Sequence, residues 1–197
     1  YSTGTLNIST STCNAIGSEV AVIEGANSVN LIDTNAISNV ANKWAVMIYQ
    51  SFSGDAQGSD GVFTMTGGSL AYTDSTGPLF YVTNSNGYIA LKSVNVTAAS
   101  GILLQAGGND RWGSSGSNGG TAYFTADGQI LTGDFVADTI SVLSIELKNG
   151  SSLTSAINAD NTAKSVTITL DTSSSWTVTA DSYVTCLVNT DGISGTN

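Results

Sequence analysis

The sequence predicts an all-β protein whose short strands run parallel and wind into a coil. Three observations lead to this fold class. The composition favours strands and tight turns, no segment has the apolar period of a helix, and the apolar pattern repeats at a spacing of 23 residues. At 197 residues the chain has a length typical of one domain and is long enough to bury a substantial core.

The composition supports the first two observations. The chain has 22 Gly but a single Pro, it is rich in Ser, Thr, Asn and Asp, and its Val, Ile and Leu residues occur in short runs. No long stretch combines a helical apolar period with capping residues, so helices are not expected. No run of about 18 apolar residues occurs, so a membrane-spanning helix is not expected either.

The repeat is clearest between residues 121 and 185. At an offset of 23 residues apolar positions coincide, polar positions fall between them, and turn-forming residues separate the units. This alternation with a period of two is typical of a strand with one buried face. The aligned columns are Phe124, Leu147 and Leu170; Ile130, Leu153 and Trp176; Ala122, Ile145 and Ile168; and the more polar Tyr123, Glu146 and Thr169.

A strand unit that repeats without helices predicts a coil whose successive turns stack at the strand spacing of about 4.8 Å. An antiparallel sandwich also has many short strands, but it does not predict apolar columns at a constant offset. Upstream, residues 79–84 align with residues 102–107 at the same offset, whereas residues 46–51 precede residues 79–84 by 33. The ten additional residues indicate an insertion.

Two insertions interrupt the repeat, at residues 52–61 and 108–120. Both follow the same strand of the unit and are two turns apart, so we expect their bases to lie about 10 Å apart along the coil. Insertions in repeat proteins map to loops on one face, which is often the binding face. These two corner loops are therefore the first candidates for a ligand site.

The aligned units amount to about seven turns over residues 16–189 of a single domain. A lead-in at residues 1–15 precedes them, and a tail at residues 190–197 follows. A parallel edge strand without a cap invites pairing with another strand. We therefore expect either that the tail continues in a longer parent protein or that copies of the chain associate end to end.

The two cysteines, Cys13 and Cys186, lie at opposite ends of this arrangement. A disulfide requires Cα atoms within about 7 Å, so we expect no bridge between them. Cys186 shares a column with Ile140 and Ala163 at the repeat offset, which predicts a small buried side chain.

The charge balance limits the possible partners. The chain has 15 acidic and 5 basic residues and no His, for a net charge of −10. Phosphate backbones and anionic lipids are bound mainly by Lys and Arg, so neither nucleic acid nor a membrane surface is an expected partner. Without His, the chain supplies neither a Ser-His-Asp triad nor a His-ligated zinc site.

Several runs carry a resemblance to a known fold family. AVMIYQSFSGDAQGSDGVFTMTGGSL (residues 45–70), GPLFYVTNSNGYIALKSVNV (77–96) and SIELKNGSSLTSAINADN (144–161) resemble the pectin-lyase-like right-handed parallel β-helices. Within that superfamily they are most similar to bacterial surface or secreted proteins of the adhesin and autotransporter-passenger type. The resemblance implies a right-handed parallel β-helix, or solenoid, that is secreted or displayed at the cell surface.

A structural or adhesive role with a glycan ligand follows from this resemblance and from the two loops. In the second loop a carboxylate, a guanidinium and a large aromatic ring lie next to one another, and such groups suit a carbohydrate site. The first loop adds polar acceptors. The candidate ligand-binding residues are Asp55, Gln57, Asp60, Asn109, Asp110, Arg111 and Trp112. In the alternative, Trp112 folds back over the corner and Arg111 pairs with Asp110.

The competing class is a carbohydrate-active enzyme such as a polysaccharide lyase. The resemblance to pectate lyases would imply a calcium ion held by acidic residues and a basic residue that abstracts a proton beside a uronate. Only five bases are available, and a chain with so few is a poor host for a polyanionic glycan. The bases are Lys43, Lys92, Arg111, Lys148 and Lys164. The residues thus favour a protein without catalytic activity.

Two further binding hypotheses are weaker. Acidic and amide residues near one corner offer oxygen ligands for Ca²⁺, but no EF-hand spacing or calcium-binding repeat is present, and ordinary solvated turn residues explain them better. These residues are Asp134, Asp138, Asn158, Asp160, Asn161 and Asp181. Ice binding requires stacked Thr arrays, but the Thr-x-Thr strings of this chain do not align at the repeat offset. No cofactor is therefore expected.

Overall fold

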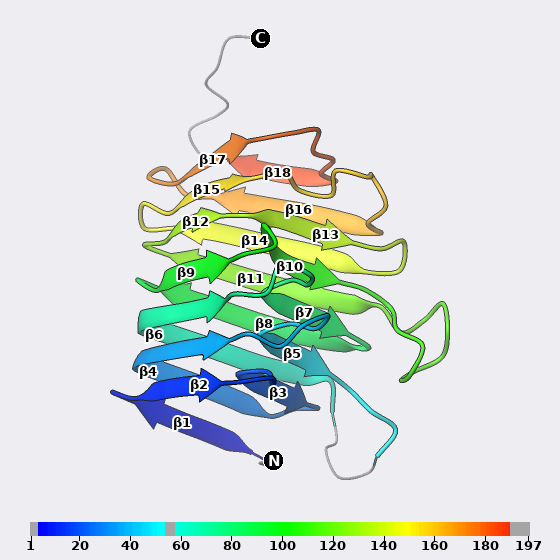
Figure 1. Ribbon diagram of the computed structural model, residues 1–197. Helices are drawn as coiled ribbons and strands as arrows, with labels where there is room; N and C mark the ends of the chain where they lie inside the picture. Colours follow the sequence, from blue (N-terminus) through cyan, green and yellow to red (C-terminus); the bar gives the residue numbers. More distant parts are fainter. Residues whose placement is uncertain (1–3, 54–57, 190–197) are drawn as a thin grey trace.

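The computed structural model describes residues 4–53 and 58–189 (Figure 1). In these residues every regular element is a β-strand, no helix is present, and all strand pairs are parallel. This part of the chain therefore has no helix long and apolar enough to cross a membrane. The all-β, parallel arrangement expected from the sequence is confirmed.

The strands form three sheets. In the first sheet the order is β1 (Thr5–Ser9), β4 (Ser28–Ser38), β6 (Asp60–Tyr72), β8 (Ser85–Lys92), β11 (Gly120–Asp127), β14 (Val142–Lys148), β16 (Ser165–Leu170) and β18 (Cys186–Asn189), with β2 (Thr12–Ala15) beside β4 and β9 (Asn95–Ala98) beside β6. The second sheet contains β13 (Asp134–Ala137), β10 (Ile102–Ala106), β7 (Phe80–Thr83), β5 (Val46–Tyr49) and β3 (Ala21–Glu24). The third contains β12 (Ile130–Thr132), β15 (Ser152–Ser155) and β17 (Ser175–Val178).

The chain visits the sheets in a repeating order. From β11 in the first sheet it passes through β12 in the third and β13 in the second, and it returns to the first sheet as β14 beside β11 (Figure 1). We use the word return for the stretch of chain between two paired residues on neighbouring strands of one sheet. Val142 pairs with Ser165, and Ser152 pairs with Ser175, so the lengths of these two returns equal the repeat expected from the sequence. The return that pairs Thr121 with Val142 is two residues shorter.

The short return corrects three aligned columns, because Ala122 pairs with Leu143 and not Ile145, and Tyr123 pairs with Ser144 and not Glu146. Phe124 pairs with Ile145, and Ala126 pairs with Leu147, so the expected match of Phe124 with Leu147 is wrong by two residues. A shift of two leaves the alternation of inward and outward side chains unchanged. The apolar pattern alone therefore does not reveal it, and Phe124, Ile145 and Leu147 are all buried as predicted.

Ile130 is a second correction, because it faces outward and is 83 % exposed. The residue opposite Leu153 is Leu131, since this return is one residue shorter than the expected repeat. A register change of one residue moves a side chain to the other face of a strand. Leu153 itself is buried between Leu131 and Trp176, so its inward position is confirmed.

The two insertions appear as two long returns in the first sheet. Ser28 pairs with Val62, and Ser85 pairs with Gly120, so each of these returns is about half as long again as the regular ones. The additional residues follow β5 in the first case and β10 in the second, and these two strands flank β7 in the second sheet. The expectation that both loops leave the same side of the fold, two strands apart, is confirmed.

The pairing of strands begins earlier than the sequence indicated. Residues 4–15, expected to be a lead-in, contain β1 and β2, and both pair with β4. Thr5 pairs with Ser28, so this first return already has the regular length of the repeat. The tail at residues 190–197 lies outside the described residues.

The core lies between the sheets and contains a ladder of aromatic rings. Phe63 is 5.6 Å from Phe80, Phe80 is 6.1 Å from Phe124, and Phe124 is 5.2 Å from Phe135, measured between ring centroids. All four rings meet edge to face and are fully buried. Burying one large apolar side chain stabilises a fold by about 1.5–3 kcal/mol, so this ladder is a major contribution to stability.

Both cysteines are free, which confirms that Cys13 and Cys186 do not bridge. The prediction that Cys186 is buried is wrong, because its side chain is exposed. Cys186 lies opposite Thr167 on the outward side of the alternation, whereas the next residue, Leu187, lies opposite Ile168 and continues the inward column.

Candidate ligand-binding groove

The outer face of the second sheet carries a groove of about 470 Å³. Its floor consists of outward-facing side chains from three neighbouring strands. Val22, Met47 and Tyr81 lie side by side in register, and Tyr49 lies on the neighbouring outward position of β5. The floor is therefore mainly apolar and aromatic.

One wall of the groove is Trp44, which precedes β5. Its ring stacks on Tyr81 with centroids 4.5 Å apart and an interplanar angle of 22°. The Tyr81 hydroxyl donates to the carbonyl of Gly108 at 3.0 Å. Burial raises the pKa of Tyr81, and the charges of Asp138 and Asp110 raise it further, so the phenol stays protonated near neutral pH and keeps this bond.

A second wall is Trp112, from the second corner loop. Its ring lies against Tyr49, with centroids 4.5 Å apart and an interplanar angle of 46°. The Arg111 guanidinium carbon is 4.9 Å from the centre of the Trp112 ring, within the range of a cation–π contact. The Tyr49 hydroxyl donates to Glu24 at 3.0 Å, so the aromatic pair is anchored to β3 as well.

Two asparagines fix the loop that presents Trp112. The Asn109 side chain donates to the Thr83 hydroxyl at 2.7 Å and accepts from the backbone N–H groups of Arg111 and Trp112 at 2.8 and 2.6 Å. The buried Asn118 side chain donates to the carbonyls of Asn109 and Trp112 at 2.5 and 2.7 Å. The loop is thus held in a defined conformation by its own polar side chains.

Charged groups lie at the edge of the groove. The Lys43 ammonium is 2.9 Å from a carboxylate oxygen of Glu19. Burial on its own raises the pKa of Glu19, but the hydrogen bond of Lys43, the backbone N–H of Glu19, the charge of Lys43 and the Ser18 hydroxyl together lower it below its usual value, so Glu19 is ionised at neutral pH. Arg111 belongs to none of the ion pairs in the described part of the chain. The groove thus holds two of the five basic residues of the sequence.

The structure brings together only part of the predicted ligand-binding set. Asn109, Arg111 and Trp112 line the groove, and the exposed Asp110 lies close enough to Tyr81 to raise its pKa. Asp60 lies apart from them, at the start of β6 in the first sheet, where it accepts a hydrogen bond from Asn86 at 2.8 Å. Asp55 and Gln57 lie outside the described residues.

The alternative expectation, that Trp112 folds back and Arg111 pairs with Asp110, agrees with the structure only in its first part. Trp112 does fold back onto the sheet, as the contact with Tyr49 shows, and it still forms a wall of the groove. The expected pairing of Arg111 with Asp110 is not among the ion pairs of residues 4–53 and 58–189. Its guanidinium contacts the Trp112 ring instead.

Sequence reasoning missed the residues that form most of the floor and one wall. Trp44, Tyr49 and Tyr81 were not singled out, because β5 and β7 are continuous apolar runs that indicate buried strands. A signal was available in the alignment of the two strands, where Tyr49 and Tyr81 occupy positions that face away from the core.

Two of the oxygen-rich residues near one corner, Asp138 and Asn158, act as turn caps. Asp138 accepts from the Ile140 N–H at 3.2 Å and the Ser141 hydroxyl at 2.6 Å, and Asn158 accepts from the Thr162 and Ala163 N–H groups at 2.9 Å. No three His, Cys, Asp or Glu side chains come together as a metal site among the described residues.

Comparison of the chain with models of known families, with curated proteins and with solved structures finds no match. The assignment of function therefore depends on the geometry of the groove.

Proposed function

We propose that the chain is a right-handed parallel β-helix of about seven turns, of the pectin-lyase-like type, from an extracellular or cell-surface adhesin. Three features support the fold assignment: all pairing is parallel, the chain visits the sheets in a fixed order, and several returns have the length of the sequence repeat. Parallel crossover connections within a sheet are right-handed in about 98 % of proteins, which gives the handedness. The chain acts as a structural and adhesive domain without catalytic activity.

The adhesive surface is the groove on the second sheet, and its ligand is a glycan. The observation that carries this proposal is the pair of tryptophan walls, Trp44 and Trp112, each packed on a tyrosine of the floor. Pyranose rings have apolar C–H faces that pack on aromatic rings, and their hydroxyls need hydrogen-bond partners at the rim. Asn109, Arg111 and the Lys43–Glu19 pair also line the groove and can supply such partners.

One buried donor beside the groove lacks a partner. Among the described residues, Nε1 of Trp44 is buried and makes no hydrogen bond. An unsatisfied buried donor costs about 1–3 kcal/mol. A sugar hydroxyl that reaches this N–H after a small rotation of the ring recovers part of that cost, so the free groove is poised for an oxygen-bearing ligand.

The charges of the groove favour a glycan with little net charge. Lys43 is engaged by Glu19, and the chain as a whole carries a net charge of −10, which repels polyanions at low ionic strength. A polysaccharide lyase needs a free base beside a bound uronate. The two bases of the groove are Lys43, which is paired, and Arg111, which stacks on Trp112, so the geometry favours binding over catalysis.

The test is a glycan array with the wild-type chain and two variants, Trp112→Ala and Tyr123→Ala, with and without calcium. Tyr123 is an exposed aromatic residue on the first sheet and is the matched control. We expect Trp112→Ala to weaken binding at least about tenfold, equivalent to about 1.4 kcal/mol, and Tyr123→Ala to leave it unchanged. Equal binding by the wild type and Trp112→Ala contradicts the proposal, and release of an unsaturated uronate, followed by ultraviolet absorbance, supports the lyase instead.

A further inference from the structure

Two tyrosines on the outer face of the first sheet lie ring over ring. Tyr88 of β8 and Tyr123 of β11 are paired residues on neighbouring parallel strands, and their rings stack with centroids 4.7 Å apart and planes 8° apart. Both residues are exposed. Theirs is the one contact between two tyrosine rings in residues 4–53 and 58–189. Two phenols are thus held together in contact with solvent.

The strands beneath the two rings are firmly placed. β8 and β11 lie in the middle of the first sheet, between β6 and β14, and pair over their whole lengths without a register shift (Figure 1). The residues that follow the two tyrosines, Ile89 and Phe124, are buried in the core. The two Cα atoms therefore stay about one strand spacing, roughly 4.8 Å, apart, and the rings move relative to each other only by rotation of their side chains.

The rings themselves are free to rotate. In the described part of the chain neither hydroxyl of the pair forms a hydrogen bond, whereas the hydroxyls of the buried Tyr72 and Tyr81 donate to backbone carbonyls. The neighbours of the pair in the same outward column are the smaller Val62 and Ser144. Exposed side chains change rotamer within nanoseconds. The two rings can therefore open from the stacked arrangement until their edges meet.

We propose that this pair is a site of oxidative cross-linking, at which a one-electron oxidant joins Tyr88 and Tyr123 as dityrosine. Each phenol loses one electron and its hydroxyl proton, which leaves a radical with spin density on the oxygen and on the adjacent ring carbons, Cε1 and Cε2. A bond then forms between one Cε atom of each ring, and the hydrogens on these two carbons move to the oxygens and restore the phenols. An oxidant such as persulfate takes up the two electrons and becomes two sulfate ions, and water takes up the two protons.

The geometry favours coupling within one molecule. A radical on an isolated tyrosine has to meet a second radical by diffusion, whereas each ring of this pair already touches its partner. Fixing two reactants in contact replaces a bimolecular step by a unimolecular one. The yield of the link should therefore not depend on protein concentration. Tyr183 provides the contrast, because it is also exposed but takes part in no ring contact among the described residues.

The new bond acts as a covalent staple across one of the two long returns. Residues 89–122 lie between the two tyrosines and include the second corner loop. Closing a long loop covalently restricts the unfolded chain, as a disulfide does, so the link should raise the melting temperature by about 5 °C or more. This proposal is independent of the glycan groove, which lies on the outer face of the second sheet.

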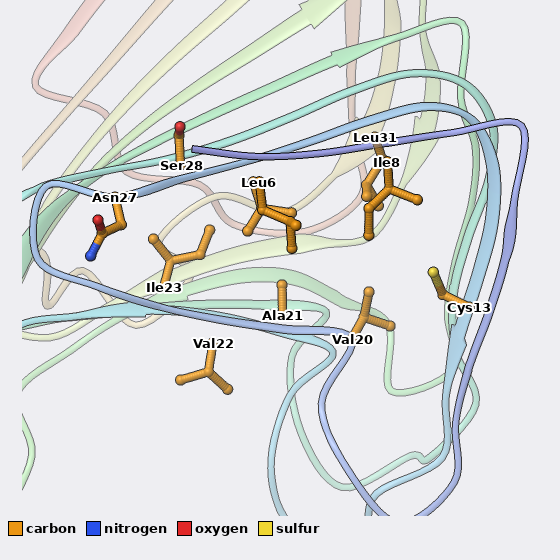
Figure 2. Close-up of a pocket in the computed structure, with 11 residues that line it drawn as sticks. Leu6, Ile8, Cys13, Val20, Ala21, Val22, Ile23, Asn27, Ser28 and Leu31 are labelled. Carbon is orange, nitrogen blue, oxygen red and sulfur yellow. The ribbon is translucent and has the colours of Figure 1, made fainter. Parts of the chain in front are cut away.

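The two free cysteines compete for the same oxidant, because thiols are readily oxidised. Cys186 is exposed, and Cys13 is partly buried. Figure 2 shows Cys13 among the side chains that line a hollow of about 390 Å³. Alkylation of both thiols before the oxidant is added removes them from the reaction.

The test exposes the alkylated wild-type chain and three variants to a light-activated ruthenium complex with persulfate. Tyr88→Phe and Tyr123→Phe keep both rings but remove one phenol, and Tyr183→Phe is the matched control. Trypsin cleaves after Lys and Arg, so the link joins the peptide of residues 44–92 to that of residues 112–148, in which Tyr123 is the single tyrosine. We expect mass spectrometry to find the joined peptides, two hydrogen atoms lighter than their sum, in the wild type and Tyr183→Phe, with a yield that dilution does not change. Neither variant of the pair should give them.

The oxidant dose is raised until Tyr183 of the wild type is modified, so that a pair that stays unlinked is informative. Absence of the joined peptides at that dose contradicts the proposal, and so does a yield that falls on dilution, which indicates coupling between copies. Joined peptides that persist in Tyr88→Phe contradict it as well, because the bond then lies on another tyrosine. Oxidation should raise the melting temperature of the wild type relative to its effect on Tyr88→Phe, and an equal change in both contradicts the staple.

Discussion

The outer faces of the first and second sheets both carry stacked aromatic residues, and on the second sheet these residues belong to a groove. On the first sheet, Tyr88 and Tyr123 stack with ring centroids 4.7 Å apart and planes 8° apart, and they are 40 % and 38 % exposed. On the second sheet, Tyr81 is only 8 % exposed. An aromatic column by itself therefore leaves its rings partly exposed to solvent.

The difference comes from residues outside the strands. Trp44 precedes β5, and Trp112 belongs to the loop after β10, and each packs on a tyrosine of the second sheet. These connecting residues add walls to a floor that the strand register supplies. The comparison indicates that binding on this fold is determined by the connections, whereas stability is determined by the columns.

The largest expected effect concerns the core on which both faces are built. Leu153→Asp should cost several kcal/mol, because it buries an unpaired carboxylate in an inward column, and we expect it to abolish cooperative unfolding or expression of folded protein. Ile130→Asp, on the outward face of the neighbouring strand, is the matched control and should change the free energy of unfolding by less than about 0.5 kcal/mol. Urea unfolding followed by circular dichroism measures both, and equal stabilities would show that the column faces solvent.

A smaller effect should separate the groove wall from the sheet beneath it. Gly113 has a φ of 75°, and a Cβ there would lie 2.4 Å from Oδ1 of Asn84 and 2.5 Å from Cβ of Asn118. Gly116 has a φ of 80° but no atom within 4 Å of its Cβ position. Gly113→Ala should therefore lower the free energy of unfolding by about 2–3 kcal/mol and weaken glycan binding. Gly116→Ala should lower it only by the backbone strain of about 1 kcal/mol and leave glycan binding unchanged. Identical effects of the two changes would mean that the loop is not held as described.

Removing one aromatic residue from each face sharpens the comparison further. Trp44→Ala should destabilise the fold by about 1–2 kcal/mol, because it removes a half-buried ring and its stacking on Tyr81. Tyr123→Ala should cost about 0.5–1 kcal/mol, the range for a cross-strand pair on an exposed face. Thermal unfolding measures both. A larger loss of stability for Tyr123→Ala than for Trp44→Ala would contradict the expectation that the aromatic contact on the second sheet is the stronger one.

The smallest effect concerns a turn rather than a face. The backbone N–H of Asn149, and then the hydroxyls of Ser174 and Ser173, lower the pKa of Asp171 from 3.8 to about 2. A carboxyl group with a lowered pKa in the folded state adds stability above its unfolded pKa, and this stability is lost as pH falls from 3.8 toward 2. We expect Asp171→Asn to flatten the dependence of melting temperature on pH in that window, and an unchanged slope would contradict the assigned hydrogen bonds.

Much of the fold could be predicted from the sequence, because inward and outward residues alternate along most strands. Leu147, Leu153 and Leu170 were placed in the core, and both insertions were located, from periodicity alone. The failures at Ile130 and Cys186 come from returns that are shorter than the regular repeat, so that Ile130 pairs with Ser152 and Cys186 pairs with Thr167. Turns and loops set the lengths of those returns, and an alignment at a constant period does not show that these lengths differ.

The groove could be predicted only in part. Arg111 and Trp112 stood out because they interrupt a loop rich in Gly and Ser. Tyr49 and Tyr81 did not, because β7 is covered on both faces and β5 nearly so, and strands of that kind lose their alternation. Whether an outward tyrosine is covered depends on a loop that is distant in sequence, and periodicity does not report such contacts.

The most direct test of the central claim is to follow the three indole N–H signals in a two-dimensional NMR spectrum while a glycan identified on the array is added. Trp44 and Trp112 are the walls of the groove, whereas Trp176 lies in β17 and donates to the carbonyl and hydroxyl oxygens of Ser155 at 3.2 and 3.1 Å. Binding in the groove predicts that the Trp44 and Trp112 signals shift together along one saturation curve while the Trp176 signal stays in place. A shift confined to Trp176, or no indole shift under conditions in which the glycan is bound, would contradict the assignment of the groove.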